Sequence, residues 1–294
     1  MKIINFGSLN IDHVYRVKDF VTPGETIASD SYELFCGGKG CNQSVALSLA
    51  GAEILHASKI GSDGSVLKEK LSKAGVDTSV IENSSQPTGH AIIQVSNSGE
   101  NSIIIHGGAN RDLSKDYIGK VLEKADREDY VLTQNETSGV SEIIDQAFAK
   151  GLKVVFNPAP ITPEVNDYPL DKVSILIVNE TEGAELSGFT APDEILSLLA
   201  ACYPNATIVL TLGAEGVAIK NANEELQISA EKVKVVDTTA AGDTFIGYFL
   251  AEFTKGSSVE DSAIIACKAA AICVQTMGAT DSIPLKDSLS LLIS

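Results

Sequence analysis

The sequence has few basic residues for its length. It carries 22 lysines and arginines against 39 aspartates and glutamates, which gives a formal net charge of −17 at pH 7. A chain with a large negative net charge is unsuited to bind nucleic acid or an anionic membrane. The charge still allows a small anionic ligand, which local dipoles can hold.

Paired cysteines and long apolar runs are also missing. The chain has five cysteines and four histidines, with no C-x-x-C pair, and this pattern argues against a zinc site or a disulfide framework. The longest apolar stretch, "SAIIACKAAAICV", is interrupted by Lys268 and is too short to span a membrane. The N-terminal apolar run is too short for a signal peptide. We therefore expect a soluble, cytoplasmic protein with buried, reduced thiols at Cys36, Cys41, Cys202, Cys267 and Cys273.

Short β-branched runs alternate with helical patterns along most of the chain. "KIINFGS", "EILHASKIG", "DYVLTQNE", "LKVVFNPAP", "VSILIVNE" and "ATIVLTLG" resemble strands, several of them apolar on both faces. Segments such as "NQSVALSLAGA" and "VSEIIDQAFAKG" lie between them and have helical spacing. This alternation predicts an α/β domain around a mostly parallel sheet, with helices gathered in the last third. We expect one such domain over residues 1–294.

Two regions interrupt the alternation. Residues 12–36 and 88–106 alternate apolar and polar residues with no helix between them, and each contains a turn. We expect them to form a small separate sheet with one apolar face, seen in "AIIQV" and "IIIH". A ligand, the main domain or a second subunit would have to cover that face.

Two glycine-rich passages each precede a helical stretch. In "VKVVDTTAAGDTFIGYFLAEF", small residues precede Asp243 where a helix begins. Free N–H groups there suit an anion, and an acid beside them suits the removal of a proton from a nucleophile. An ordinary N-terminal acid favoured by the helix dipole is the alternative. The second passage, "CGGKGCNQS", is neither a P-loop nor a dinucleotide fingerprint, but Lys39 and Asn42 flank its glycines and can contact a hydroxylated ligand.

Polar residues also follow the predicted strands, at the edge where open α/β sheets bind ligands. For each of them a turn or a helix cap is the alternative explanation. Their types nevertheless suggest separate roles: hydroxyl binding by Asp12, Asn42 and Glu136, oxygen ligands for hydrated Mg²⁺, and a nucleotide lying along "TLGAEG". The strand-end candidates are Asn10, Asp12, Glu136, Asn157, Asn179, Glu182, Thr211 and Gly213.

Together these motifs resemble the ribokinase/PfkB family of sugar kinases. "DTTAAGDTF" and "GGKGCNQSVALSLAGA" are similar to its two signatures, and "GSLNIDH", "PGET", "HGGAN", "NPAP", "NETE" and "TLGAEG" occur in the expected order. The resemblance implies a Rossmann-like three-layer α/β sandwich with a small β-sheet lid. It also implies phosphorylation of a pentose by ATP, at the 5-hydroxyl of D-ribose. A kinase of another sugar, deoxysugar or nucleoside and a non-catalytic sugar sensor are the alternatives, although a sensor has no need of an acid at position 243.

The resemblance also implies a role for each matching residue. Asp243 would be the catalytic base and would also contact the substrate, beside an anion hole of Ala240, Ala241 and Gly242. The sugar would bind Asn10, Asp12, Gly38, Lys39, Asn42 and Glu136. ATP with Mg²⁺ would bind Asn179, Glu182, Thr211, Gly213, Gly216 and Gly242, with Cys267 near the adenine where relatives often carry His or Asn. A monovalent cation, K⁺, would lie among Asp237, Thr239, Cys273, Thr276, Gly278 and Ser282, and a homodimer would form through the lid.

Overall fold

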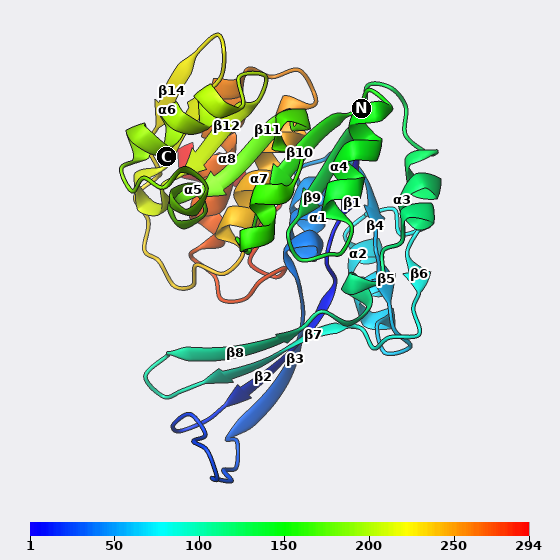
Figure 1. Ribbon diagram of the computed structural model, residues 1–294. Coiled ribbons are helices and arrows are strands. Elements are labelled where there is room, and N and C mark those ends of the chain that lie inside the picture. Colours follow the sequence, from blue (N-terminus) through cyan, green and yellow to red (C-terminus); the bar gives the residue numbers. More distant parts are fainter. Residues whose placement is uncertain (294) are drawn as a thin grey trace.

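The protein is built around an eight-stranded sheet covered by helices on both faces (Figure 1). The structure is a computed structural model that describes residues 1–293, with side chains to Leu289. The sheet pairs its strands in parallel except at one edge, where β13 runs antiparallel to both neighbours. Its order is β14 (Glu225–Ile228), β13 (Val217–Lys220), β12 (Thr207–Thr211), β11 (Ile175–Asn179), β10 (Lys153–Asn157), β9 (Tyr130–Gln134), β1 (Lys2–Phe6) and β4 (Glu53–Ala57).

The three layers follow from side chains that alternate along buried strands. Ile3 of β1 and Ile177 of β11 face one core, whereas their neighbours Ile4 and Leu176 face the other. The first core is covered by α1 (Lys39–Leu49), α2 (Ser65–Lys73), α7 (Ala241–Phe253) and α8 (Val259–Cys273). The second is covered by α3 (Lys115–Leu122), α4 (Val140–Ala149), α5 (Glu180–Ser187) and α6 (Pro192–Cys202).

A second, four-stranded sheet projects away from this body (Figure 1). Its strands, in spatial order, are β3 (Ser31–Gly37), β2 (Asn10–Arg16), β7 (Gly89–Val95) and β8 (Asn101–His106). The predicted sandwich and small sheet are therefore confirmed, although β2 and β3 extend slightly beyond residues 12–36. We call this sheet the lid.

The prediction of a single apolar face on the lid is wrong. Paired residues share a face, and the register places Asp12, Phe35, Ala91 and Ile105 together. Ile104 must point the other way, because neighbours in a strand alternate. Since Ile104 is 65% exposed and Ile105 is 61% exposed, both faces carry apolar surface.

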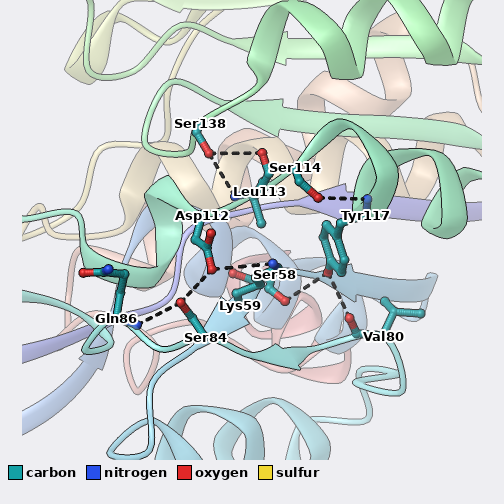
Figure 2. Close-up of polar contacts among 10 residues, drawn as sticks. All are labelled: Ser58, Lys59, Val80, Ser84, Gln86, Asp112, Leu113, Ser114, Tyr117 and Ser138. Carbon is teal, nitrogen blue, oxygen red and sulfur yellow. Dashed lines mark hydrogen bonds and ion pairs between the residues drawn. The ribbon is translucent and has the colours of Figure 1, made fainter.

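Polar contacts brace the chain where it enters the lid, as Figure 2 shows. The Tyr117 hydroxyl lies 2.9 Å from the carbonyl oxygens of both Ser58 and Val80. Nearby, Ser84 Oγ donates to Asp112 at 2.7 Å and accepts from the Gln86 N–H at 3.0 Å. These bonds tie Tyr117 of α3 and Asp112 to residues that flank the short strands β5 (Lys59–Ile60) and β6 (Glu82–Asn83).

Two details differ from the sequence-based expectation. The antiparallel strands β13 and β14 were not predicted, because their four residues each give too short an alternation. The cysteines are all free, but Cys202 is exposed and Cys36 is half-buried, so the prediction of burial was wrong for Cys202.

Within residues 1–293, none of the helices has both the length and the apolarity needed to cross a bilayer.

Candidate functional site

The start of α7 places an acid beside backbone N–H groups, of which that of Ala241 donates to the Thr238 carbonyl at 3.2 Å. Ala240 takes a left-handed conformation (φ 61°), which turns the chain into the helix, and among the described residues no other non-glycine has positive φ. A Cβ built on Gly242 would meet no atom within 4 Å, so the space above the helix start is open. Asp243 follows one residue later and is only 8% exposed. The predicted anion hole and acid thus lie together.

Two side-chain amides hold the carboxylate of Asp243. Asn42 Nδ2 donates to Oδ2 at 2.9 Å, and Gln43 Nε2 donates to Oδ1 at 2.8 Å. Both amides come from α1, which packs against α7. Donors to a carboxylate favour its ionised form. Asn42 was predicted at the site from sequence, whereas Gln43 was missed.

The first turn of α1 lies close to the loop that joins β1 and β2. A Cβ on Gly40 would lie 2.3 Å from Gly7 Cα, so only glycine permits this approach. Glu136 bridges the two segments, because its carboxylate accepts from the Ser8 hydroxyl and, at 2.9 Å, from the Lys39 N–H. Burial opposes the charge of Lys39, but the carboxylates of Asp243, Glu136 and Glu182 outweigh burial and raise the pKa of Lys39 above its ordinary value. The predicted sugar residues Gly38, Lys39 and Glu136 are therefore brought together at this helix start.

The predicted lid residues meet at the base of β2. Asn10 Oδ1 accepts from Asn110 Nδ2 at 2.8 Å, and Asn110 also pairs with the Leu9 backbone. Asn110 lies in the "HGGAN" motif but was not selected as a site residue. Burial, with a smaller contribution from the charge of Glu136, raises the pKa of Asp12 to about 7. Gly37 leaves room for that carboxylate, because a Cβ there would lie 2.0 Å from Asp12 Oδ2.

A cavity of about 230 Å³ opens next to Asp243. It lies at the carboxyl ends of β10, β11 and β12, where ligands of open α/β sheets bind. The cavity is lined both by residues that were predicted from the sequence and by residues that were not. The lining residues are Lys39, Asn157, Ala159, Ile177, Val178, Asn179, Glu182, Thr211, Thr238, Ala240, Gly242, Asp243 and Ile246.

Asn179 and Glu182 form the N-terminal cap of α5. Asn179 Oδ1 accepts from the Glu182 N–H at 2.8 Å, and the Glu182 carboxylate accepts from the Asn179 N–H and side-chain amide, each at 3.0 Å. Burial raises the pKa of Glu182. A carboxylate facing the cavity fits hydrated Mg²⁺, which keeps several waters and uses few protein ligands. The cap explanation is therefore confirmed for this pair, and a role of the pair in ligand binding stays a prediction.

The predicted nucleotide segment begins at this cavity. Thr211 lines it, and the chain then turns through Gly213 (φ 54°) and Gly216 (φ 104°). Gly216 passes so close to β14 that a Cβ would lie 2.0 Å from the Ile228 carbonyl oxygen. Cys267 is instead buried in the first core, and burial raises its pKa to about 11. Cys267 is not among the residues that line the cavity.

The two loops predicted to hold a monovalent cation lie together. Asp237 accepts from the Thr239 N–H at 2.9 Å and, with its second oxygen, from the Gly278 N–H at 2.9 Å. Partial burial opposes ionisation, but these hydrogen bonds outweigh it and hold the pKa of Asp237 below its ordinary value. Cys273 Sγ lies 3.1 Å from Ser282 Oγ and donates to the Thr239 carbonyl at 3.7 Å, and the Thr276 N–H donates to the Cys273 carbonyl at 3.2 Å.

Comparison with known proteins places the chain in a family. Residues 1–286 match the model of the pfkB family carbohydrate kinases. The chain belongs to the pfkB family of carbohydrate kinases. Membership makes it an ATP-dependent sugar kinase, as the motifs predicted.

Individual relatives of this pfkB chain are similar over their whole length. A ribokinase of Haemophilus influenzae is 39% identical over 289 residues, which is 95% of this chain and 94% of that protein. The solved Arabidopsis thaliana ribokinase complexed with ribose and ATP superposes with a TM-score of 0.89 at 30% identity, covering 100% of this chain and 98% of that one. A ribokinase from Cryptococcus neoformans var. grubii in complex with ADP gives a TM-score of 0.86 at 33% identity, with 99% of each chain covered.

Proposed function

We propose that this protein transfers the γ-phosphoryl group of ATP to the 5-hydroxyl of D-ribose and releases ADP and ribose 5-phosphate. The main support for this proposal is Asp243, a buried acid whose carboxylate accepts hydrogen bonds from two side-chain amides. It lies beside the open N-terminus of α7 and beside a cavity. The ribose specificity is supported by curated and solved ribokinases at 30–39% identity that match nearly the whole chain.

The residues divide the reaction between two sides. Asn10, Asp12, Asn42 and Glu136 bind the sugar hydroxyls under the lid, while Thr211 to Gly216 lie along the nucleotide. Asp243 accepts the proton of the attacking sugar hydroxyl. At the same time the hydroxyl oxygen bonds to the γ-phosphorus, and the bond between the γ-phosphorus and the oxygen that stays with ADP breaks. The N–H groups at residues 240–243 stabilise the charge of the transferring group. Asn179 and Glu182 would hold a hydrated Mg²⁺, which would neutralise phosphate charge, and Lys39 adds a fixed positive charge.

Two further features belong to the proposal. A K⁺ ion bound by Asp237, Ser282 and backbone carbonyls of Thr239, Cys273, Thr276 and Gly278 would fix the loop that precedes the anion hole. Two chains would associate through their lids, because exposed apolar patches of this kind usually mark an interface. The part of α8 that carries Cys267 would lie toward the adenine, but the thiol of Cys267 would not contact the base.

A coupled ADP-release assay over pentoses, hexoses, 2-deoxyribose and nucleosides tests the substrate. We expect D-ribose to give the highest kcat/KM, and ³¹P spectroscopy to identify a 5-phosphate product. A higher kcat/KM with a nucleoside or a hexose would replace ribose as the substrate and leave the sugar-kinase chemistry intact.

A further inference from the structure

The side of Asp243 that faces the protein interior contacts Gln43. This glutamine is fully buried, and both hydrogens of its amide are used. Nε2 donates to Asp243 Oδ1 at 2.8 Å and to Asn157 Oδ1 at 3.2 Å. Asn157 in turn donates to the Ile177 carbonyl at 3.0 Å. Gln43 therefore has one amide orientation that satisfies both neighbours.

A second buried glutamine fixes that orientation. Gln134 Nε2 donates to Gln43 Oε1 at 2.7 Å and to Asn5 Oδ1 at 3.0 Å. If the Gln43 amide turned over, its oxygen would face the carboxylate of Asp243 and its nitrogen would face the donor group of Gln134. Both contacts would then be repulsive, so Gln134 determines which atom of Gln43 meets Asp243.

The network continues away from the cavity and ends in a neutral group. Asn5 Nδ2 donates to Ser44 Oγ at 2.8 Å, and Ser44 Oγ lies 2.7 Å from His56 Nδ1. Each of these side chains is fully buried. Burial lowers the pKa of His56 to about 3, so the imidazole is neutral. The network thus brings no second charge to Asp243.

We propose that Gln43 and Gln134 are positioning residues for phosphoryl transfer, with Gln134 setting the amide of Gln43 and Gln43 aiming the carboxylate of Asp243 at the sugar hydroxyl. This inference rests on the proposed function, because it takes Asp243 as the base. A buried polar cluster that only fills the core would stabilise the fold and leave the chemistry unchanged. The two roles differ in whether kcat falls while ribose affinity is kept, and in whether the losses of kcat multiply.

The test compares Gln43→Met, Gln134→Met and the double variant with Thr133→Val, using ADP release with saturating D-ribose and ATP. Met keeps the length of Gln and removes its amide. Thr133 is the matched control, because it is also fully buried and precedes Gln134 in β9. Its hydroxyl contacts only backbone carbonyls, that of Phe6 at 3.1 Å and that of Gln134 at 3.4 Å, and none of the side-chain amides of the network. Thermal unfolding and ribose affinity are measured for each variant.

We expect Gln43→Met to lower kcat about 10²-fold, as a misplaced catalytic group does, with ribose Kd changed less than threefold. Gln134→Met should lower kcat in the same direction without weakening ribose binding, because it frees the Gln43 amide that contacts Asp243. Thr133→Val should leave kcat within threefold of the unmodified protein.

The double variant tests whether the two residues act in series. We expect its kcat to equal that of Gln43→Met within threefold, because Gln134 acts only through Gln43. Multiplied losses, or an unchanged kcat in Gln43→Met, would overturn the inference. Asp243→Asn is measured in parallel: if that variant stays active, the proposed base is wrong, whereas an inactive Asp243→Asn with normal Gln43 variants contradicts the positioning role alone.

Discussion

At the scale of single residues, Asp12 has the clearest consequence for binding. Its pKa is raised to about 7, first by burial and then by the charge of Glu136. In the proposed complex, sugar hydroxyls would donate to the ionised carboxylate, so binding would favour the charged form. Below pH 7 the free protein must lose a proton in order to bind, and ribose affinity should therefore increase as the pH rises from 6 to 8.

Calorimetry of ribose binding at pH 6, 7 and 8 measures this dependence. We expect Kd at pH 6 to exceed Kd at pH 8 by about tenfold, the change of one pH unit below the raised pKa. The Asp12→Asn variant should bind more weakly and lose the pH dependence. The same Kd at pH 6 and pH 8 in the unmodified protein would show that Asp12 does not accept these hydroxyls.

2-Deoxyribose should also be the poorer substrate, because a missing hydroxyl leaves the carboxylate of Asp12 unpaired.

At the scale of elements, the pairing of β2 with β3 makes Gly37 a site residue. A Cβ there would lie 2.0 Å from Asp12 Oδ2, so Gly37→Ala must displace the carboxylate. We expect ribose KM to rise about tenfold or more, the effect of weakening hydrogen bonds to a charged group, with a smaller change in kcat. Gly119→Ala in α3 is the control, because its Cβ would meet only the flexible end of Gln146 at 3.4 Å. An unchanged KM in Gly37→Ala would mean that the lid adjusts freely.

The loops beside α7 and α8 form the second element-scale prediction. Replacing Na⁺ with K⁺ at constant ionic strength should raise kcat, because a filled cage preorganises the N–H groups of residues 240–243. Asp237→Ala should abolish the response, since it removes both the carboxylate and its bonds to Thr239 and Gly278. Identical rates of the unmodified protein in the two salts would mean that these loops only pack together.

The same scale shows what the sequence could and could not predict. The alternation of strands and helices was enough for the α/β domain and the small sheet, and small residues before a helical stretch marked the acid at the start of α7, because these are local patterns. Gln43 was missed because its partner Asp243 lies 200 positions away and only the packing of α1 on α7 joins them. Gly37 was missed because its importance depends on the register of β2 and β3, and Asn110 because its partners Leu9 and Asn10 lie about 100 positions away. The short strands β13 and β14 carried too little pattern to be predicted.

At the scale of the whole molecule, the lid has apolar residues on both faces. Ile103 is 49% exposed and Ile104 is 65% exposed, and they point to opposite sides of β8. The double variant Ile103→Glu/Ile104→Glu therefore disrupts lid–lid packing through either face. Sedimentation at micromolar concentration should give a dimer for the unmodified protein and for Phe148→Glu, a control on the exposed side of α4, but a monomer for the double variant. A monomeric unmodified protein would contradict the proposed dimer.

The whole molecule brings one acid from α7, two amides from α1 and a cavity at three strand ends to a single place, and Asp243→Asn tests that arrangement most directly. The variant is isosteric and keeps the neighbours of the carboxylate. Its kcat for ADP release with D-ribose should fall by about 10²–10⁴-fold or more, while calorimetry gives a ribose Kd within a few-fold of the unmodified protein. A near-normal kcat with intact ribose binding would contradict the assignment of Asp243 as the base that starts phosphoryl transfer.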